Sequence, residues 1–437
     1  MAIYTKDGVG KLPANQILST VIEKGLEADA NFIHLEPMND LVRVKYRVAG
    51  SLVSGPEIPK KRLKSLIDKI KSLANIQTGN LDLISGGKFK YSFNGQGFSL
   101  RVYIMPTING EKVTFKVQND APISDTVEQL GFWGSGLQTI EQAVNLKSGL
   151  ILVTGPNDSG KSKTIATLLE SINDHSLNVA TLEDPVEFKI SRANQTQINH
   201  KTNLNFKNGI KILSKQDNDI IMLSELSDST TINEALDIVT HKKLVISSLN
   251  VSSAVETITR LLDYGISPAS LAYALRIIIN QRLIKRLCPD CKQYVILDKA
   301  TSNKINELFG LNNPTNMRYI HNLEVEYNQH KLAEKKVGSK LLSTTETKIK
   351  KIWVSSPKGC LSCSHTGFKG RIAVAEILKN SPEIERLIIT KSKDLLINKQ
   401  AVREGMVNYL IDGLLKVLIG ETTIDEVISL TKSSYLT

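Results

Sequence analysis

An octapeptide near residue 160 leaves this 437-residue chain few possible folds. It fits the pattern G-x-x-x-x-G-K-[ST], follows a short apolar run at residues 150–154 and precedes a helical pattern at residues 163–171. In a loop of this kind, backbone N–H groups point at phosphate oxygens and the helix N-terminus adds favourable partial charge. We predict that a nucleotide is bound by the following residues: Gly155, Pro156, Asn157, Asp158, Ser159, Gly160, Lys161, Ser162 and Lys163.

Three side chains of this phosphate loop decide its expected chemistry. Lys161 would reach the β- and γ-phosphates, and the Ser162 hydroxyl would bind Mg²⁺. Asp158 instead places a carboxylate inside the loop, where it repels a triphosphate unless it points outward. The alternative interpretation is a glycine-rich connection that binds no ligand.

The pattern of apolar residues changes along the chain and predicts two domains. From residue 149, short apolar runs at residues 149–154, 179–182, 220–223 and 244–247 alternate with helical segments, which is typical of a parallel α/β sheet. Residues 1–118 combine helical patterns at 16–28 and 60–73 with several strand patterns, and predict a small α+β domain. Residues 119–125 read as a linker, and residues 126–437 as the nucleotide-binding domain.

The C-terminal half of the second domain has a less regular pattern. Residues 292–350 are polar and read as irregular, and helical periodicity returns at residues 381–389 and 400–419.

The composition is that of a soluble globular protein, with 41% hydrophobic and 23% charged residues. No apolar run approaches the roughly 18 residues that span a bilayer, and the N-terminus has no signal pattern, so we expect a cytoplasmic protein. The net charge of +11 is partly local, because residues 335–351 hold six lysines against the single acid Glu346. This basic segment is either a solvated loop or a surface for an acidic or membrane-bound partner. The charge also leaves open a protein that handles nucleic acid.

All four cysteines fall into two C-x-x-C pairs, Cys288 with Cys291 and Cys360 with Cys363. Two such pairs complete a tetrahedral Zn²⁺ site, and a closed site of four thiolates would be structural. Residues 292–359 separate the pairs, which is more than an ordinary zinc ribbon has. The alternative is four free or redox-active thiols.

Carboxylates follow two of the predicted buried strands. Glu225 comes after the run at residues 220–223, so it would emerge at the edge of the sheet where ligands bind in α/β folds. There it could orient or deprotonate the attacking water. Glu183 and Glu187 follow another strand, and Glu183 could position Mg²⁺ or the water. Each is alternatively an exposed acid at a strand end.

Together with further segments, these motifs resemble the ATPases of type IV pilus assembly and type II secretion, a family of hexameric P-loop motors. Residues 181–187 read TLEDPVE, close to the family's aspartate box, and residues 217–228 read DNDIIMLSELSD, close to its Walker B element. Residues 31–37 (NFIHLEP) and 43–52 (RVKYRVAGSL) resemble its N-terminal domain. The flanks of the cysteine pairs, QRLIKRLCPDC and GCLSCSHTGFKGRIAVAEIL, resemble its tetracysteine motif. The resemblance covers roughly residues 15–435.

The resemblance implies an α/β protein in which a small PAS-like N-terminal α+β domain precedes a RecA-like P-loop ATPase domain. A Cys₄ zinc knuckle would be inserted at about residues 285–370. ATP, Mg²⁺ and Zn²⁺ would be the cofactors. Catalysis would depend on Glu225, Glu183, Lys161 and two cations of the N-terminal domain, Arg101 and Arg47.

The resemblance also implies a partner set and a place in the cell. The chain would form a homo-hexamer at the cytoplasmic face of the inner membrane. It would push on an inner-membrane platform protein to assemble a pilus or a secretion pseudopilus. The tetracysteine motif favours assembly or secretion over pilus retraction, and the order of motifs argues against nucleic acid as the partner. No room is expected for the additional N-terminal domain that many assembly ATPases carry. A pilus, a pseudopilus and a DNA-uptake fibre all stay open as the product.

Several positions depart from the family pattern. The two histidines of its histidine box become Lys243 and Asn250, and the glycine and arginine near Glu225 become Ser224 and Ser227. A clamp arginine becomes Lys116, which keeps the charge but loses the bidentate geometry. Two interpretations follow: a slow but working motor, which the retained Lys161, Glu183 and Glu225 favour, or a nucleotide-binding subunit with little turnover that works with an active paralogue.

Overall fold

The computed structural model describes residues 12–76, 85–121, 123–172, 176–199, 202, 204–332 and 348–434. The chain forms two compact units. The first comprises residues 1–121 with the segments 288–291 and 355–371, and the second comprises residues 122–287, 292–354 and 372–437. The units divide within the predicted linker. The two cysteine segments, which the sequence analysis counted with the second domain, fall in the first unit.

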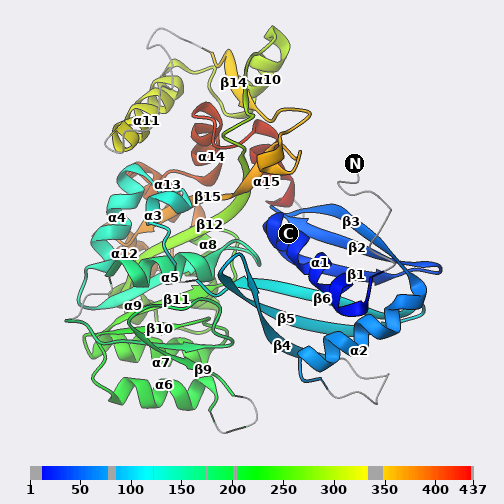
Figure 1. Ribbon diagram of the computed structural model, residues 1–437. Coiled ribbons are helices and arrows are strands. Elements are labelled where there is room, and N and C mark those ends of the chain that lie inside the picture. Colours follow the sequence, from blue (N-terminus) through cyan, green and yellow to red (C-terminus); the bar gives the residue numbers. More distant parts are fainter. Residues whose placement is uncertain are drawn as a thin grey trace. The chain divides into compact units, whose positions relative to one another are not determined.

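The first unit is built on a six-stranded antiparallel sheet with the strand order β3-β2-β1-β6-β5-β4. Its strands are β1 (Ala30–Pro37), β2 (Leu41–Val48), β3 (Ser51–Pro59), β4 (Ser85–Phe93), β5 (Gln96–Thr107) and β6 (Gly110–Asn119). Two helices, α1 (Ala14–Glu27) and α2 (Leu63–Leu73, after the 3₁₀ turn Lys60–Arg62), lie on one face of this sheet (Figure 1). Alternate residues such as Ile33 and Leu35 on β1 point into the core beneath the helices, so the opposite face is polar.

The second unit is built on a seven-stranded sheet with the order β15-β12-β7-β11-β10-β8-β9. Its strands are β7 (Gly149–Thr154), β8 (Val179–Glu183), β9 (Ala193–Gln197), β10 (Ile220–Leu223), β11 (Leu244–Leu249), β12 (Leu275–Leu287) and β15 (Phe368–Lys379). The strands from β12 to β9 are parallel. This confirms the α/β class expected from the buried apolar runs.

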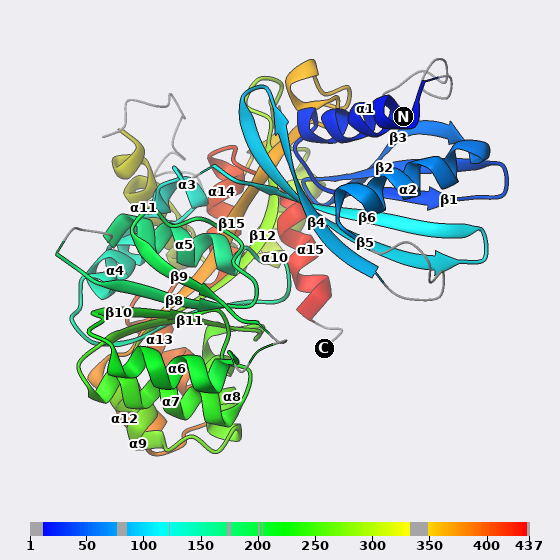
Figure 2. The ribbon, with the colours of Figure 1, turned by 60° about the horizontal axis from the view of Figure 1, so that its bottom comes forward.

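Helices cover both faces of this sheet, α6 and α7 on one side and α4 and α5 on the other (Figure 2). A hydrophobic core lies on each face of the sheet, and successive residues of β7 point into them alternately. Leu150 and Leu152 pack in one core, and Ile151 and Val153 pack in the other. The helices of this unit are α3 (Val127–Leu130), α4 (Gly134–Val144), α5 (Lys161–Ile172), α6 (Phe206–Lys215), α7 (Ser229–Thr240), α8 (Ala254–Asp263), α9 (Pro268–Ala274), α12 (Pro382–Ile389), α13 (Asp394–Arg403), α14 (Tyr409–Leu418) and α15 (Ile424–Ser434).

The stretch after Cys291 is more ordered than the sequence predicted. The strands β13 (Gln293–Ile296) and β14 (Lys351–Val354) pair antiparallel and enclose the helices α10 (Lys299–Leu308) and α11 (Pro314–Leu332). The prediction of an irregular segment was therefore wrong. The single helical pattern at residues 400–419 is also divided, because α13 ends at Arg403 and α14 begins at Tyr409. Residues 333–347, most of the basic segment, lie outside the described residues.

Candidate functional site

The predicted phosphate loop connects the buried strand β7 to the N-terminus of α5. Its backbone passes through the left-handed region at three places: Gly155 has φ 145°, Asp158 has φ 61° and Gly160 has φ 88°. Glycine enters this region without a steric cost, and aspartate enters it more readily than most side chains do. The loop therefore turns sharply between β7 and α5.

The start of the loop packs closely against β12. A Cβ added at Gly155 would collide with the backbone carbonyl of Gln281 and lie 2.6 Å from the Ser159 Oγ atom. That hydroxyl is buried and has no hydrogen-bond partner in the part of the chain that the structure describes. Buried polar atoms are rarely left unpaired, so the Ser159 hydroxyl has unused hydrogen-bonding capacity. With the N-terminus of α5 beside it, the loop fits a phosphate group.

Lys161 lies across the loop. Its Nζ atom donates to the carbonyl oxygens of Gly155, at 3.0 Å, and Pro156, at 2.9 Å. Burial lowers the pKa of this ammonium group, while the carboxylates of Glu225, Asp158 and Glu187 act in the opposite direction. The structure thus places the carboxylates near the phosphate loop within electrostatic reach of its lysine.

The other loop positions differ in their surroundings. Asp158 is exposed, and its carboxylate acts on the charge of Lys161. Asn157 is exposed too, and Ser162 is half-buried at the start of α5. The Nζ atom of Lys163 is 2.6 Å from the Oδ2 atom of Asp125, so this lysine is held by a residue outside the loop.

The candidate catalytic carboxylates lie at the carboxyl ends of the parallel strands, the same edge of the sheet as the phosphate loop. Glu225 follows β10 and accepts a hydrogen bond of 2.5 Å at Oε1 from the Asn250 amide, which follows β11. Glu183 is the last residue of β8 and is 4% exposed. Its Oε1 atom accepts from the Thr181 hydroxyl at 2.6 Å and from the Gln195 amide at 3.0 Å.

Burial raises the pKa of the Glu183 carboxyl group, and the two hydrogen bonds that it accepts offset this in part. A carboxyl group in such surroundings binds a proton or a cation more readily than an exposed one does.

The two positions that correspond to the histidine box are separated in space. Asn250 lies at the carboxyl end of β11, whereas Lys243 precedes its first residue and so lies at the opposite edge of the sheet. Lys243 Nζ donates to the carbonyl oxygens of Ser214, at 3.1 Å, and Gln216, at 2.6 Å. Among these two positions, only Asn250 lies at the same edge of the sheet as the phosphate loop.

Arg47 and Arg101 belong to the first unit, on the polar face of its sheet. The register pairs Arg47 with Phe32, Phe32 with Lys116, and Lys116 with Arg101. Directly paired residues point to the same face, so three cations share one row across β2, β1, β6 and β5, and Lys88 on β4 extends it. The row is a concentrated positive charge that suits an anionic ligand, and the part of Arg47 and Arg101 in catalysis stays a prediction.

The four cysteine thiols converge within the first unit. Their Sγ atoms all lie within 4.8 Å of one another, with Cys288 to Cys360 at 3.7 Å and Cys291 to Cys363 at 3.8 Å. A tetrahedron of thiolates about 2.3 Å from a zinc ion has edges of about 3.8 Å. The four residues therefore fit a tetrahedral metal ion.

The backbone around Cys363 favours its thiolate form. Its Sγ atom accepts from the N–H groups of Cys360 and Gly367, each at 3.2 Å. Burial would raise the pKa of this thiol, but the two N–H donors, together with the thiols of Cys360 and Cys291, outweigh it and lower the pKa to about 6. A metal ligand must be deprotonated, so this environment prepares Cys363 to bind one.

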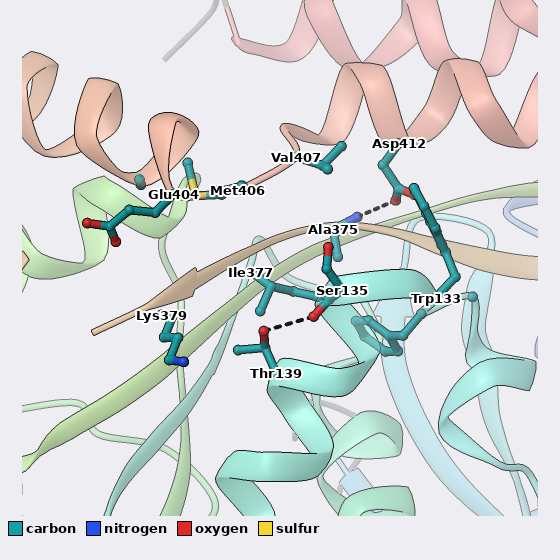
Figure 3. A pocket seen from close by; sticks show the side chains of 15 residues that line it. Trp133, Ser135, Thr139, Ala375, Ile377, Lys379, Glu404, Met406, Val407 and Asp412 are labelled. Carbon is teal, nitrogen blue, oxygen red and sulfur yellow. Dashed lines mark hydrogen bonds between the residues drawn. The ribbon is translucent and has the colours of Figure 1, made fainter. Parts of the chain in front are cut away.

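A small cavity of about 100 Å³ lies elsewhere in the second unit, among α4, β15 and α14, and its lining includes no phosphate-loop residue (Figure 3). Beside it, the buried carboxylate of Asp412 accepts from the Trp133 indole at 2.6 Å and from the backbone N–H of Ala375 at 2.8 Å. Lys416 Nζ pairs with the same carboxylate at 2.6 Å. This network joins α14 to β15 and the start of α4.

Sequence reasoning missed two amide side chains of the site, Asn280 and Gln281 on β12. Both are 1% exposed, and both bond to the phosphate loop or to the strand before it. The signal was present in the sequence: two amides interrupt the apolar run LRIIINQRLIKRL of β12. A polar residue inside a buried strand is retained only where it is hydrogen-bonded.

A family model described as "Type II/IV secretion system protein" matches residues 7–429. Among curated proteins, the chain is 31% identical to the type IV pilus assembly ATPase PilB of Thermus thermophilus, over 96% of this chain and 43% of that protein. It is 27% identical to the putative type II secretion system protein E of Escherichia coli, over 97% of this chain and 78% of that protein. It is 30% identical to the type II secretion system protein E of Xanthomonas campestris, over 98% of this chain and 69% of that protein. The chain thus spans less than half the length of the Thermus protein and about three quarters of the Escherichia one.

Solved structures show the same fold at low sequence identity. The ATPase DotB of Legionella pneumophila matches with a TM-score of 0.65 and 15% identity, over 96% of each chain. The pilus retraction motor PilT with bound ADP matches with a TM-score of 0.55 and 18% identity, over 94% of this chain and 95% of that one. Within the described residues, no helix is long and apolar enough to cross a membrane.

Proposed function

Because the chain belongs to the type II/IV secretion system protein family, we propose that it is an ATPase that powers assembly of a type IV pilus or a type II pseudopilus. One observation carries the proposal: a phosphate loop with its lysine, and a carboxylate held by a neighbouring amide, meet at one edge of a parallel sheet. That arrangement supplies a phosphate-binding cradle and a base or orienting group for water within one site.

Each residue at this edge has a distinct task in the proposal. The loop N–H groups, the Ser159 hydroxyl and Lys161 bind phosphate oxygens, and Lys161 exchanges its two carbonyl partners for them. Ser162 holds Mg²⁺, which neutralises phosphate charge when bound, and Glu183 assists from the end of β8. Glu225 orients or deprotonates the attacking water.

The finer parts of the proposal concern architecture and assembly. The second unit is a RecA-like ATPase domain and the first a PAS-like domain, whose antiparallel sheet with helices on one face suits that class. The first unit contributes Arg101 and Arg47 to the nucleotide phosphates. The chain works as a homo-hexamer, peripheral to the cytoplasmic face of the inner membrane, on a platform protein.

The cysteine cluster holds Zn²⁺ as a structural ion. The thiol spacing and the N–H groups directed at Cys363 support this. Four thiolates leave a tetrahedral ion no open position, so the site does not take part in hydrolysis.

Steady-state ATP hydrolysis by the purified oligomer tests the proposal. Lys161→Ala should abolish nucleotide binding and turnover, whereas Glu225→Gln should keep binding and reduce kcat by roughly a hundredfold or more. Lys211→Ala, on the exposed side of α6, is the control and should match the unchanged protein.

The second candidate function is a nucleotide-binding subunit with little turnover. It is favoured by Asn250, which cannot change charge as a histidine can, in contact with Glu225. Nucleotide binding with no hydrolysis above that of the Lys161 and Glu225 variants would establish it and reject the motor proposal for the chain alone.

A further inference from the structure

Three consecutive polar side chains are buried in the middle of β12. Asn280 and Gln281 are 1% exposed and Arg282 is 7% exposed, inside a strand whose neighbours are apolar. Burying polar groups costs free energy unless each finds a hydrogen-bond partner. What these side chains bond to therefore shows which parts of the second unit the strand holds together.

Gln281 holds the phosphate loop itself. Its Nε2 atom donates to the Ser159 carbonyl at 2.8 Å, and its Oε1 atom accepts from the Thr164 hydroxyl on α5 at 2.9 Å. One amide thus ties the loop to the helix that follows it. The Gln281 backbone carbonyl also closes the space beside Gly155.

Asn280 joins two different loops. Its Nδ2 atom donates to the Thr154 hydroxyl at 2.9 Å and to the Val251 carbonyl at 3.0 Å. Thr154 is the last residue of β7 before the phosphate loop. Val251 directly follows Asn250, whose amide donates to Glu225. A single buried amide therefore lies between the base of the phosphate loop and the residue that holds the candidate catalytic carboxylate.

Arg282, two positions after Asn280 along β12, supports the same segment. Its Nη2 atom donates to the Ser252 carbonyl at 3.2 Å, and its guanidinium lies 4.5 Å from the centre of the Tyr409 ring on α14. The backbone of residues 251 and 252 is thus held at two successive carbonyls by Asn280 and Arg282, two alternate side chains of one strand.

We propose that Asn280 is a positioning residue that couples the phosphate loop to Glu225 by holding the loop after β11, while Gln281 keeps the phosphate loop in its binding shape. The inference rests on the proposed nucleotide hydrolysis. It assigns different tasks to neighbouring amides: loss of Gln281 weakens nucleotide binding, and loss of Asn280 slows the chemical step.

Kinetics and binding together separate these tasks. Asn280→Ala should lower kcat roughly tenfold or more, because small misplacements of a reacting group are costly, with Kd for a non-hydrolysable ATP analogue changed by less than about twofold. Gln281→Ala should raise that Kd by roughly tenfold. The control is Asn306→Ala, an equally buried asparagine on α10 that bonds Ser302 and Ile349. It should lower the melting temperature without moving kcat or Kd.

A double variant tests whether Asn280 acts through Asn250. If it does, Asn250→Ala combined with Asn280→Ala should be no slower than Asn250→Ala alone, because both remove the same restraint. Rate losses that simply multiply would overturn the proposal. So would an Asn280→Ala protein that loses stability as the Asn306 control does and keeps its kcat.

Amide hydrogen exchange gives a measurement that does not need turnover. In the unchanged protein, the ATP analogue should slow exchange at residues 250–253 as well as in the phosphate loop, and in Asn280→Ala only the loop should be protected. If the unchanged protein shows this coupling but hydrolyses no ATP, the motor proposal fails and the coupling stands. If it hydrolyses ATP and Asn280→Ala retains protection at residues 250–253, the inference about Asn280 is wrong.

Discussion

Asp158 combines the backbone shape that the phosphate loop needs with a charge that a phosphate-binding loop does not need. It occupies a left-handed position, φ 61°, that suits glycine, and its carboxylate acts on Lys161 from an exposed place. The backbone of the loop is thus preserved while a negative charge is added near the phosphates. We therefore expect the Asp158 carboxylate to change the affinity for nucleotide and not the stability of the fold.

We expect Asp158→Gly to tighten ATP binding. Asp158 is exposed, so a water-like dielectric constant near 80 applies, and removing one like charge about 4 Å away is then worth about 1 kcal/mol, or roughly fivefold in Kd. Titration with a fluorescent ATP analogue at low and high salt measures it, and the gain should shrink as salt screens the charge. Asn157→Gly, a change at an adjacent exposed and uncharged position, is the control. An unchanged Kd at low salt would show that the carboxylate does not act on the bound nucleotide.

Glu183 should make stability depend on pH. Burial raises its pKa in the folded chain, so between its ordinary pKa and the raised value the folded state holds a proton that the unfolded state has lost. Stability therefore falls as pH rises through this window, by at most about 1.4 kcal/mol for each unit of pKa shift.

Glu183→Gln removes this titration, and its Oε1 atom can still accept from Thr181 and Gln195. Without nucleotide, its melting temperature should exceed that of the unchanged protein at pH 8 and approach it at pH 5. Glu141 is an exposed glutamate on α4, and Glu141→Gln should leave the melting temperature unchanged at both pH values. A difference that is the same at both pH values would contradict the assignment to Glu183.

At the scale of single residues, the sequence was most informative where chemistry demands a spacing. The loop pattern located Gly155, Gly160 and Lys161, and the two C-x-x-C pairs predicted the thiols that converge. What it could not indicate was pairing across the sheet. Asn250 contacting Glu225 and Lys243 pointing to the opposite edge depend on strand direction and register. These follow from packing, not from a local pattern.

At the scale of helices and strands, elements with a clear local pattern were predicted and the others were not. Buried strands bounded by turns were predictable: β7 and β10 have the predicted bounds, because a short apolar run has few other uses. The strand β12 was missed because its central Asn280, Gln281 and Arg282 break the apolar run, and they are tolerated only through partners distant in sequence. The helix α11 was missed because its apolar residues form no clear stripe along residues 314–332.

The cysteine knuckles are the element whose stability should depend on a ligand. Cys363→Ser should reduce bound zinc below one ion per chain and lower the melting temperature by several degrees, because metal-binding free energy contributes directly to folding. Metal analysis and thermal unfolding measure both. Ser362→Ala, in the same 3₁₀ turn, is the matched control and should retain the ion. A full complement of zinc in Cys363→Ser would reject the four-thiolate site.

At the scale of the whole molecule, hydrolysis should depend on both units. Arg101 lies in the row of cations with Lys116 and Arg47, on a unit that contains no part of the phosphate loop. Arg101→Ala should reduce kcat by roughly tenfold to a hundredfold if this unit supplies charge to the phosphates. Arg101→Lys should recover only part of the loss, because a bidentate contact is not restored by an ammonium group.

The matched control for that prediction is Lys90→Ala, another cation of the same sheet on the edge strand β4, outside the row. It should leave kcat unchanged. Equal losses in the two variants would indicate a general effect of net charge instead of a specific contact.

The position of the knuckles has a consequence for how such proteins diversify. Residues 292–359 form a long segment between β12 and β15, two strands that are neighbours in one sheet. The proposed zinc ion would join both ends of this segment and fix where the chain enters and leaves it. Closing a loop twice as long costs only about 0.6 kcal/mol more. Segments of different size could therefore be inserted here, by evolution or by a protein engineer, as long as residues such as Ile305 and Ile320 keep the core that they share with Ile284 of β12 and Val374 of β15.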